Sequence, residues 1–313
     1  MPRRFLADLA LLVVTAIWGL TFVMVRDAVH AYPVFAFLAT RFALALVGLV
    51  PVLLWRRHHL RSVGRGPTGR GVRLRRQLAA GALIGVALFA GYAFQTMGLL
   101  FTTPAKAGFI TGLSVVIVPL LGVIFWRERL HPAVIGGVAV ALVGLGLLSL
   151  SGVRSPMAVN PGDLLVLACA VSFAGQIVLV GRFAPRMNAL VLTTAQIATV
   201  ALLSAGISLV WEHPPVWPPR GQPLFAALFT GLLATALAFG VQTAAQRFTT
   251  ATHAALIFAA EPVFAALGSY LLIGEVLSLS QWLGCGLILA GMLLAELGPG
   301  LRRRRRMTAV ESV

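Results

Sequence analysis

The sequence is poor in charged residues, and acidic ones are especially scarce. Only 11% of its 313 residues are charged, and Asp and Glu together number 9. Soluble domains carry charge at roughly 25% of their positions. A water-exposed surface is therefore excluded for most of this chain, because 59% of its residues are hydrophobic.

Cysteine is also scarce, and the motifs of common catalytic centres are missing. Cys169 and Cys285 have no metal-ligand spacing, which favours small packing residues over a metal site. No H-E-x-x-H, G-x-S-x-G or Walker sequence occurs. The glycine-rich stretch at 64–71 lacks the G-K-[ST] ending of a phosphate-binding loop. We therefore predict that the protein is not an enzyme and holds no metal or cofactor.

Long apolar runs are what the chain has in abundance. Each is near the length of about 20 residues that a helix needs to cross a bilayer core. We predict an all-α polytopic membrane protein with ten transmembrane helices. The first run shows no A-x-A cleavage site, which favours a retained helix over a signal peptide. The expected spans are 6–25, 33–54, 78–100, 105–126, 132–150, 164–183, 190–211, 224–246, 254–273 and 281–297.

Two short motifs indicate that the chain is built twice. QTMGLLFTT begins at Gln95, and QTAAQRFTT begins 147 residues later at Gln242. Five spans per copy is an odd number, so the second copy would enter the membrane from the opposite side, as in inverted repeats of carriers. The expected units are 6–150, 163–298 and a disordered basic cytoplasmic tail at 299–313. Further matches, at this offset or at 155 near the start of each copy, are Lys106 with His253, Asp8 with Asp163, Trp18 with Phe173, and Arg41 with Gln196.

The positive charges are distributed unevenly about the predicted spans. A net charge of +16 would suggest nucleic acid as the partner of a soluble chain. Here, 20 of the 25 basic residues fall in the termini and the loops of one side, 4 fall on the other side, and Arg41 falls inside a span. This bias predicts that both termini are cytoplasmic. It also predicts that the basic face lies against anionic lipid headgroups rather than nucleic acid.

Two charged residues fall near the middle of predicted spans. Arg41 and Glu261 each lie about eight residues into a span, and a charge at mid-bilayer costs roughly 2.5–3.5 kcal/mol on insertion scales. One interpretation is that they border a polar cavity and bind substrate or a proton. The other is a buried ion pair, or a carboxylate satisfied by nearby hydroxyls. Pro262 follows Glu261 and removes a helix hydrogen bond, so we expect a kink there, although the first copy has Val115 at that place.

Uncharged polar and aromatic residues supply the remaining site candidates. Gln95 and Gln242 could read a polar substrate through their amides or tie two helices together. Trp18, Tyr92 and Phe239 could line a cavity, or else serve in packing or at the membrane interface.

Two further residue pairs have more than one interpretation. Lys106 and His253 could be membrane-interface residues, gates or simple helix-end anchors. Gly81 and Gly85 form a G-x-x-x-G pattern for close helix contact, within the chain or between the two chains of a homodimer.

Three segments resemble a known family. They are AIWGLTFV at 16–23, YAFQTMGLLFTTPAKAGFITGL at 92–113, and EPVFAALGSYLLIGEVLSLSQWLGCGLILAGMLL at 261–294. In these the chain resembles bacterial members of the drug/metabolite transporter superfamily, EamA-type branch. The resemblance implies ten helices around a central cavity, location in the inner membrane, and export of amino acids, metabolites or drugs.

The predicted function is therefore transport of a small molecule. We expect a secondary-active or facilitative carrier that works by alternating access. Its site candidates are Trp18, Arg41, Tyr92, Gln95, Gln242 and Glu261. A flippase for lipids or lipid-linked carriers is the alternative within transport. A membrane receptor or scaffold is the alternative outside it, and a sealed apolar core would favour that one.

Overall fold

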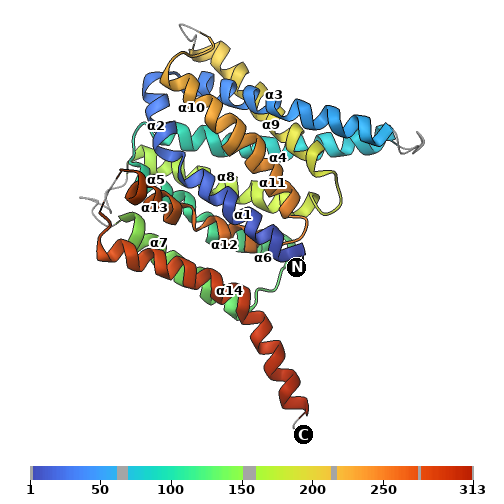
Figure 1. Cartoon of the computed structure of the whole chain (residues 1–313), viewed down its shortest axis with the longest axis vertical. Coiled ribbons are helices and arrows are strands. Elements are labelled where there is room, and N and C mark those ends of the chain that lie inside the picture. The colour runs from blue at the N-terminus through green and yellow to red at the C-terminus, as the bar shows by residue number, and fades with distance from the viewer. Residues whose placement is uncertain (1–2, 62–69, 151–159, 213–216, 274–275, 312–313) are drawn as a thin grey trace.

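The computed structural model describes residues 3–61, 70–150, 160–212, 217–273 and 276–311, and these ranges contain helices and no strand. The helices run side by side in one bundle (Figure 1). The first half holds α1 (Arg3–Gly19), α2 (Phe22–Ala31), α3 (Val34–Arg61), α4 (Arg70–Gly98), α5 (Pro104–Gly112), α6 (Ser114–Trp126) and α7 (Pro132–Leu150). The second half holds α8 (Pro161–Phe183), α9 (Ala189–Ile207), the π-helical η1 (Ser208–Glu212), α10 (Gln222–Gly231), the π-helical η2 (Leu232–Leu237), α11 (Ala238–Ala245), α12 (Ala251–Phe258), α13 (Glu261–Ile273) and α14 (Leu279–Glu311).

The helices make the chain an integral membrane protein. Within the described ranges, seven helical stretches are long and apolar enough to cross a bilayer, and α1 with α2 makes an eighth that is bent by 42°. Two shorter apolar stretches, Ala251–Leu267 and Leu279–Ala295, complete the set. Several expected spans are therefore interrupted helices, which apolar run length alone does not reveal.

The C-terminal segment is helical, although we predicted that it would be disordered. Helix α14 continues to Glu311, past the position after which we predicted a disordered tail. Arginine, leucine, methionine and alanine dominate this segment, and all four favour helix. The glycine-rich stretch at 64–71 lies mostly outside the described residues.

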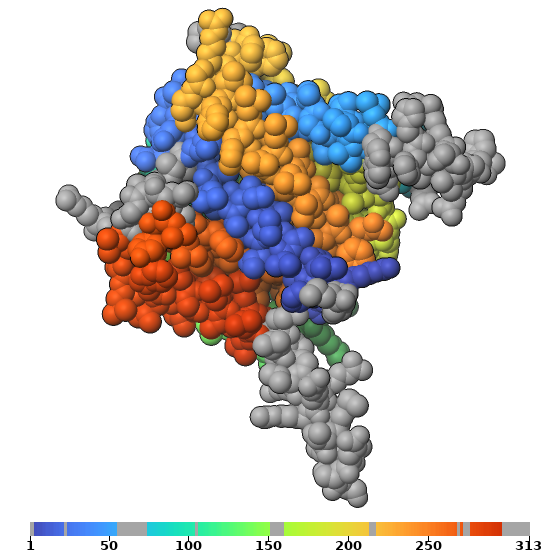
Figure 2. Space-filling view, in the orientation of Figure 1, coloured from blue at the N-terminus to red at the C-terminus, as the bar shows by residue number. Residues whose placement is uncertain are grey.

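The first helix of each half packs against the opposite half. Helix α1 contacts α11, α12 and α13, while α8 contacts α4, α5 and α6. Figure 2 shows this exchange on one face, where the blue N-terminal segment lies between the orange and red segments of the second half. Because the halves interlock in this way, helices from both of them enclose the centre of the bundle.

Equivalent glycines bring α7 and α14 into backbone contact. A Cβ on Gly137 would lie 2.5 Å from the Gly291 carbonyl oxygen, and one on Gly144 would lie 2.7 Å from that of Gly284. The order of the partners reverses along the second helix, so α7 and α14 run antiparallel.

The G-x-x-x-G pattern is used within the chain. A Cβ on Gly81 would lie 3.1 Å from the Leu192 carbonyl oxygen, and one on Gly85 would lie 2.8 Å from that of Gln196. Both partners belong to α9, so the pattern brings α4 close to α9 and no longer argues for a homodimer.

Candidate functional site

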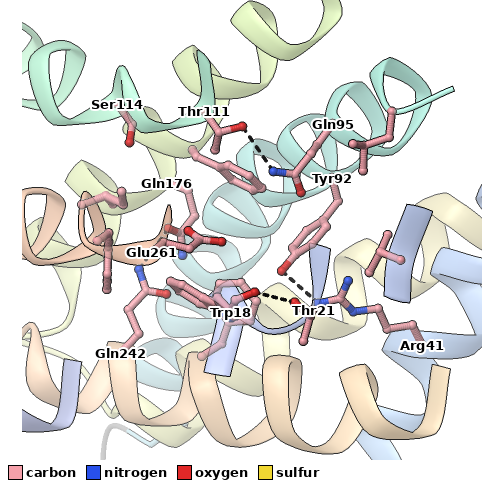
Figure 3. A pocket seen from close by; sticks show the side chains of 16 residues that line it. Trp18, Thr21, Arg41, Tyr92, Gln95, Thr111, Ser114, Gln176, Gln242 and Glu261 are labelled. Atoms are coloured by element: carbon pink, nitrogen blue, oxygen red, sulfur yellow. Dashed lines mark hydrogen bonds between the residues drawn. The ribbon is translucent and has the colours of Figure 1, made fainter. Parts of the chain in front are cut away.

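A cavity of about 80 Å³ lies between the two halves (Figure 3). One water needs about 10–15 Å³ of such space, so there is room for several waters or for part of a small molecule. The cavity brings together six predicted site residues from distant parts of the chain, namely Trp18, Arg41, Tyr92, Gln95, Gln242 and Glu261.

The lining consists largely of residues that are equivalent between the halves. Extending the two sequence offsets pairs most of the wall residues with one another. Equivalent positions of the two halves therefore face the cavity from both sides. The equivalent pairs in its wall are Trp18 with Phe173, Thr21 with Gln176, Tyr92 with Phe239, Gln95 with Gln242, Thr111 with Phe258, and Ser114 with Glu261.

Arg41 is a buried cation held by neutral groups. Its side chain is 2% exposed. Its Nε donates to Thr235 Oγ1 at 2.9 Å, and its Nη2 donates to the Tyr92 hydroxyl at 3.2 Å. The guanidinium carbon lies 4.6 Å from the centroid of the Tyr92 ring, which favours a cation. Among the described residues it makes no ion pair, so Arg41 and Glu261 do not form the buried pair that was one of the two interpretations of the sequence.

A π-helical turn positions Arg41 and Trp18 together. The turn η2 supplies Thr235 to Arg41, and its Ala234 carbonyl accepts a hydrogen bond from Trp18 Nε1 at 2.8 Å. A π turn frees backbone groups from the α-helical pattern, which is why such turns are frequent at functional sites. Just before it, a Cβ on Gly231 would lie 2.7 Å from the Arg41 carbonyl oxygen, so glycine is needed for this approach.

A residue of the second half anchors the start of α3, the helix that carries Arg41. The Glu212 carboxylate accepts hydrogen bonds from the backbone N–H groups of Phe35 and Ala36 at 2.8 and 2.7 Å. A carboxylate is favourable at a helix N-terminus, and here it anchors α3 to η1. Burial, and then the negative charge of Glu212, raise the pKa of the nearby Tyr32 hydroxyl, which lies outside the membrane-spanning segments.

Glu261 stands at an interruption in the helix that carries it. Helix α12 ends at Phe258 and α13 begins at Glu261, with Pro262 in the first turn of α13. No described residue gives the Glu261 carboxylate a hydrogen bond or an ion pair, and Figure 3 shows it directed into the cavity. A smaller cavity of about 30 Å³ reaches the same residue and is also lined by Thr111 and Ser114.

The interruption is common to both halves and does not depend on proline. Helix α5 ends at Gly112 and α6 begins at Ser114, the position equivalent to Glu261. The first half has Val115 where the second has Pro262, and its own Pro119 lies inside α6. The broken helix is therefore a shared property of the repeat, although the residue pattern predicted a kink in one copy alone.

The two equivalent glutamines differ in their surroundings. Gln242 is 1% exposed, and its Nε2 donates to the side-chain oxygens of Gln176 and Gln246 at 3.2 and 3.1 Å. Gln176 in turn donates to Gln196 at 3.2 Å, so the amides join α8, α9 and α11. Gln95 makes one longer bond, from Nε2 to Thr111 Oγ1 at 3.3 Å. Gln242 thus ties helices together as well as lining the cavity.

The aromatic candidates both pack and line the cavity. The Trp18 ring lies 5.3 Å from that of Phe239 and 5.2 Å from that of Phe258. Tyr92 meets Phe173 edge-on at 5.3 Å. These separations are those of favourable aromatic pairs.

Sequence reasoning missed several polar lining residues. Thr21, Thr111, Ser114 and Gln176 all line the cavity. The repeat offset would have found one of them, because it places Ser114 over the candidate Glu261.

Comparison with known proteins relates the whole chain to transporters. The family model described as "EamA-like transporter family" matches residues 5–150 and again 160–297. An "Uncharacterized transporter" of Archaeoglobus fulgidus is 31% identical, over 94% of this chain and 87% of that protein. A "Probable amino-acid metabolite efflux pump" of Salmonella typhimurium is 26% identical, over 96% and 97%. A solved crystal structure matches with a TM-score of 0.75 at 26% identity, covering 95% of this chain and 98% of its own.

Proposed function

The chain belongs to the EamA-like transporter family, and from this premise we propose that it exports amino acids or related small metabolites across the inner membrane. Membership of this family makes the protein a transporter rather than an enzyme. The proposed substrate class draws on the relative described as an amino-acid metabolite efflux pump, and on the charges of the cavity.

We propose an arrangement of ten spans in two inverted five-helix repeats. The count treats α1–α2, α5–α6, α9–η1, α10–α11 and α12–α13 each as one interrupted span. The antiparallel contact between the equivalent helices α7 and α14 supports the inversion, as does the exchange of α1 and α8 between halves. In this proposal the repeats are 6–150 and 163–298, the basic tail at 299–313 and both termini are cytoplasmic, and the basic face lies on anionic headgroups.

One observation carries the substrate assignment: among the described residues, the cavity wall holds one basic and one acidic side chain, which are not paired with each other. Arg41 comes from the first half and Glu261 from the second. A guanidinium can bind a carboxylate with two parallel hydrogen bonds. A carboxylate can accept an ammonium group or a proton. An amino acid offers both complementary charges, and Trp18 and Tyr92 supply apolar surface for its side chain.

Exchange with protons follows from the same arrangement. Glu261 can hold the ammonium group of the substrate or a proton, but it cannot bind both through one negative charge. Alternate occupancy therefore couples substrate release to proton uptake. The interruptions at Gly112–Ser114 and Phe258–Glu261 provide bending points for alternating access beside this carboxylate.

The test is competition for uptake into proteoliposomes, with and without a pH gradient. An amino acid that drives flux is compared with its amide, its N-acetyl derivative and its decarboxylated amine. We expect each blocked or truncated form to compete at least about thirtyfold less well, because each leaves one buried charge uncompensated at about 2 kcal/mol or more. Equal competition by all four compounds would contradict recognition of both charges. Flux that is indifferent to the gradient would contradict proton exchange.

A further inference from the structure

A buried ion pair lies outside the cavity, where α5 meets α8. Lys106 Nζ donates to Asp163 Oδ2 at 2.9 Å, and the Thr102 hydroxyl donates to Asp163 Oδ1. Lys106 and Asp163 are each 7% exposed. Asp163 also belongs to the capping box that starts α8, in which Asn160 Oδ1 accepts from its backbone N–H. We call Thr102, Lys106 and Asp163 the lysine tie.

The equivalent residues of the opposite halves meet in the same way. The two sequence offsets carry Thr102 onto Thr249, Lys106 onto His253, and Asp163 back onto Asp8. His253 Nε2 lies 3.6 Å from Asp8 Oδ2, between α12 and α1, and Arg4 Nε lies 3.9 Å from the same oxygen. We call Thr249, His253 and Asp8 the histidine tie.

The two ties lie at opposite ends of the bundle. Asp163 stands at the start of α8. Ala7, next to Asp8 in the chain, packs in one cluster with Val178, 15 residues further along α8. At a rise of about 1.5 Å per residue, this separation along α8 is about 22 Å. Each tie therefore closes the contact between halves at its own end.

Each tie is linked to the cavity through a broken helix. Lys106 lies in α5, whose continuation α6 begins with Ser114, and His253 lies in α12, whose continuation α13 begins with Glu261. Ser114 and Glu261 both line the cavity. Releasing a tie would free the segment that carries it, α5 or α12. The continuation of that helix, α6 or α13, would still contribute to the cavity wall.

The ties are unequal in this structure. The lysine tie combines a 2.9 Å ion pair with a threonine hydrogen bond. In the histidine tie the separation is 3.6 Å, and the buried Thr249 Oγ1 has no hydrogen-bond partner among the described residues. The bond equivalent to the one from Thr102 is therefore not made.

We infer that the two ties are the gates of the carrier, and that release of each opens the cavity at its own end. This inference rests on the proposed carrier function. Buried ion pairs suit a gate because the cost of removing the charges from water offsets much of their attraction. When an end opens and water enters, both charges regain hydration, so opening costs less than separating an apolar contact of similar area.

The experiment measures access to the cavity without any substrate. The background carries Cys169→Ser and Cys285→Ser, and Thr21→Cys reports from the cavity wall. A membrane-impermeant thiosulfonate is applied to sealed vesicles of either orientation. We expect Asp163→Asn to raise the labelling rate from one side by at least about fivefold, and Asp8→Asn to raise it from the other side, in the range usual for coupled sites.

The charge swap Lys106→Asp with Asp163→Lys guards against simple misfolding. It should return the labelling rate toward that of the unmodified tie. Increases from the same side for both single variants, no change for either, or a swap that behaves like Asp163→Asn would each overturn the inference. Because no substrate is used, labelling on opposite sides would support the gates even if the competition experiment fails.

Discussion

The two halves of the cavity wall share one frame but differ in charge. The first half places Arg41 where the second has Gln196, and Ser114 where the second has Glu261. Tyr92, which holds the guanidinium, has Phe239 as its equivalent. Duplication therefore supplies the helices and their crossings. The binding chemistry resides in the few positions where the copies have diverged.

A second difference concerns how firmly each wall is held. In the second half the amides of Gln176, Gln196, Gln242 and Gln246 form a connected network. In the first half Gln95 has one longer bond to Thr111. Connected buried hydrogen bonds stiffen a structure, so the amide network stiffens the second wall, whereas Arg41 and Tyr92 hold the first.

The difference in positive charge between the two halves of the cavity wall is removed when Arg41 is replaced by glutamine, the residue found at the equivalent Gln196. We expect Arg41→Gln to reduce the initial transport rate in proteoliposomes at least about thirtyfold, because losing a buried charged contact to the substrate costs about 2–5 kcal/mol. Arg186→Gln is the control, since this exposed arginine lies outside the cavity. Comparable rates for Arg41→Gln and the control would exclude the cation from binding.

The inequality of the ties predicts a smaller effect on stability. Thr102→Val removes a hydrogen bond to a charged carboxylate and should lower the free energy of unfolding by about 1.5–3 kcal/mol. Thr249→Val removes a hydroxyl that has no partner among the described residues, so we expect no loss. Thermal unfolding in detergent, read side by side for the two variants, measures the difference. Equal losses of unfolding free energy in the two variants would show that the threonine hydrogen bond is present in both ties.

The shared frame predicts equal effects for equivalent residues. Gly144→Ala and Gly284→Ala should each cost about 1–3 kcal/mol of stability, because the added methyl would lie 2.7 Å from a backbone oxygen of the facing helix. Gly286→Ala in the same α14 is the control, with nothing within 4 Å of the added methyl. Thermal unfolding again supplies the measurement. A large loss at one glycine without a loss at the other would break the equivalence of the two helices.

The sequence was sufficient to predict six of the residues that surround the cavity, although not its threonine and serine residues or Gln176. Polar residues in apolar runs, such as Arg41 and Gln95, have few places to lie in a membrane except an interior, and the repeat offset identified their counterparts. The helical class and the transporter family were likewise predicted from apolar runs and quoted motifs, and the comparisons confirm the family.

The contacts between halves were beyond such reasoning. The repeat shows that Lys106 and His253 occupy equivalent positions, as do Asp8 and Asp163. It does not show that Lys106 contacts Asp163. That contact depends on how the halves pack together. The π turn at Leu232–Leu237 was also missed, because its residue types, mostly leucine and alanine, are equally suited to an α-helix.

The glycine crossing of α7 and α14 has a consequence for motion. At this crossing, a methyl added to a glycine of one helix would lie 2.5–2.7 Å from a backbone carbonyl oxygen of the other helix. The two helices therefore have no side-chain layer between them that could slide or repack. We therefore expect this crossing to act as the pivot of the molecule, about which the remaining helices swing. A spectroscopic probe placed on α7 near Gly144 would stay at constant distance from one on α14 near Gly284 throughout the transport cycle, and it would serve as the fixed reference against which the moving helices are measured.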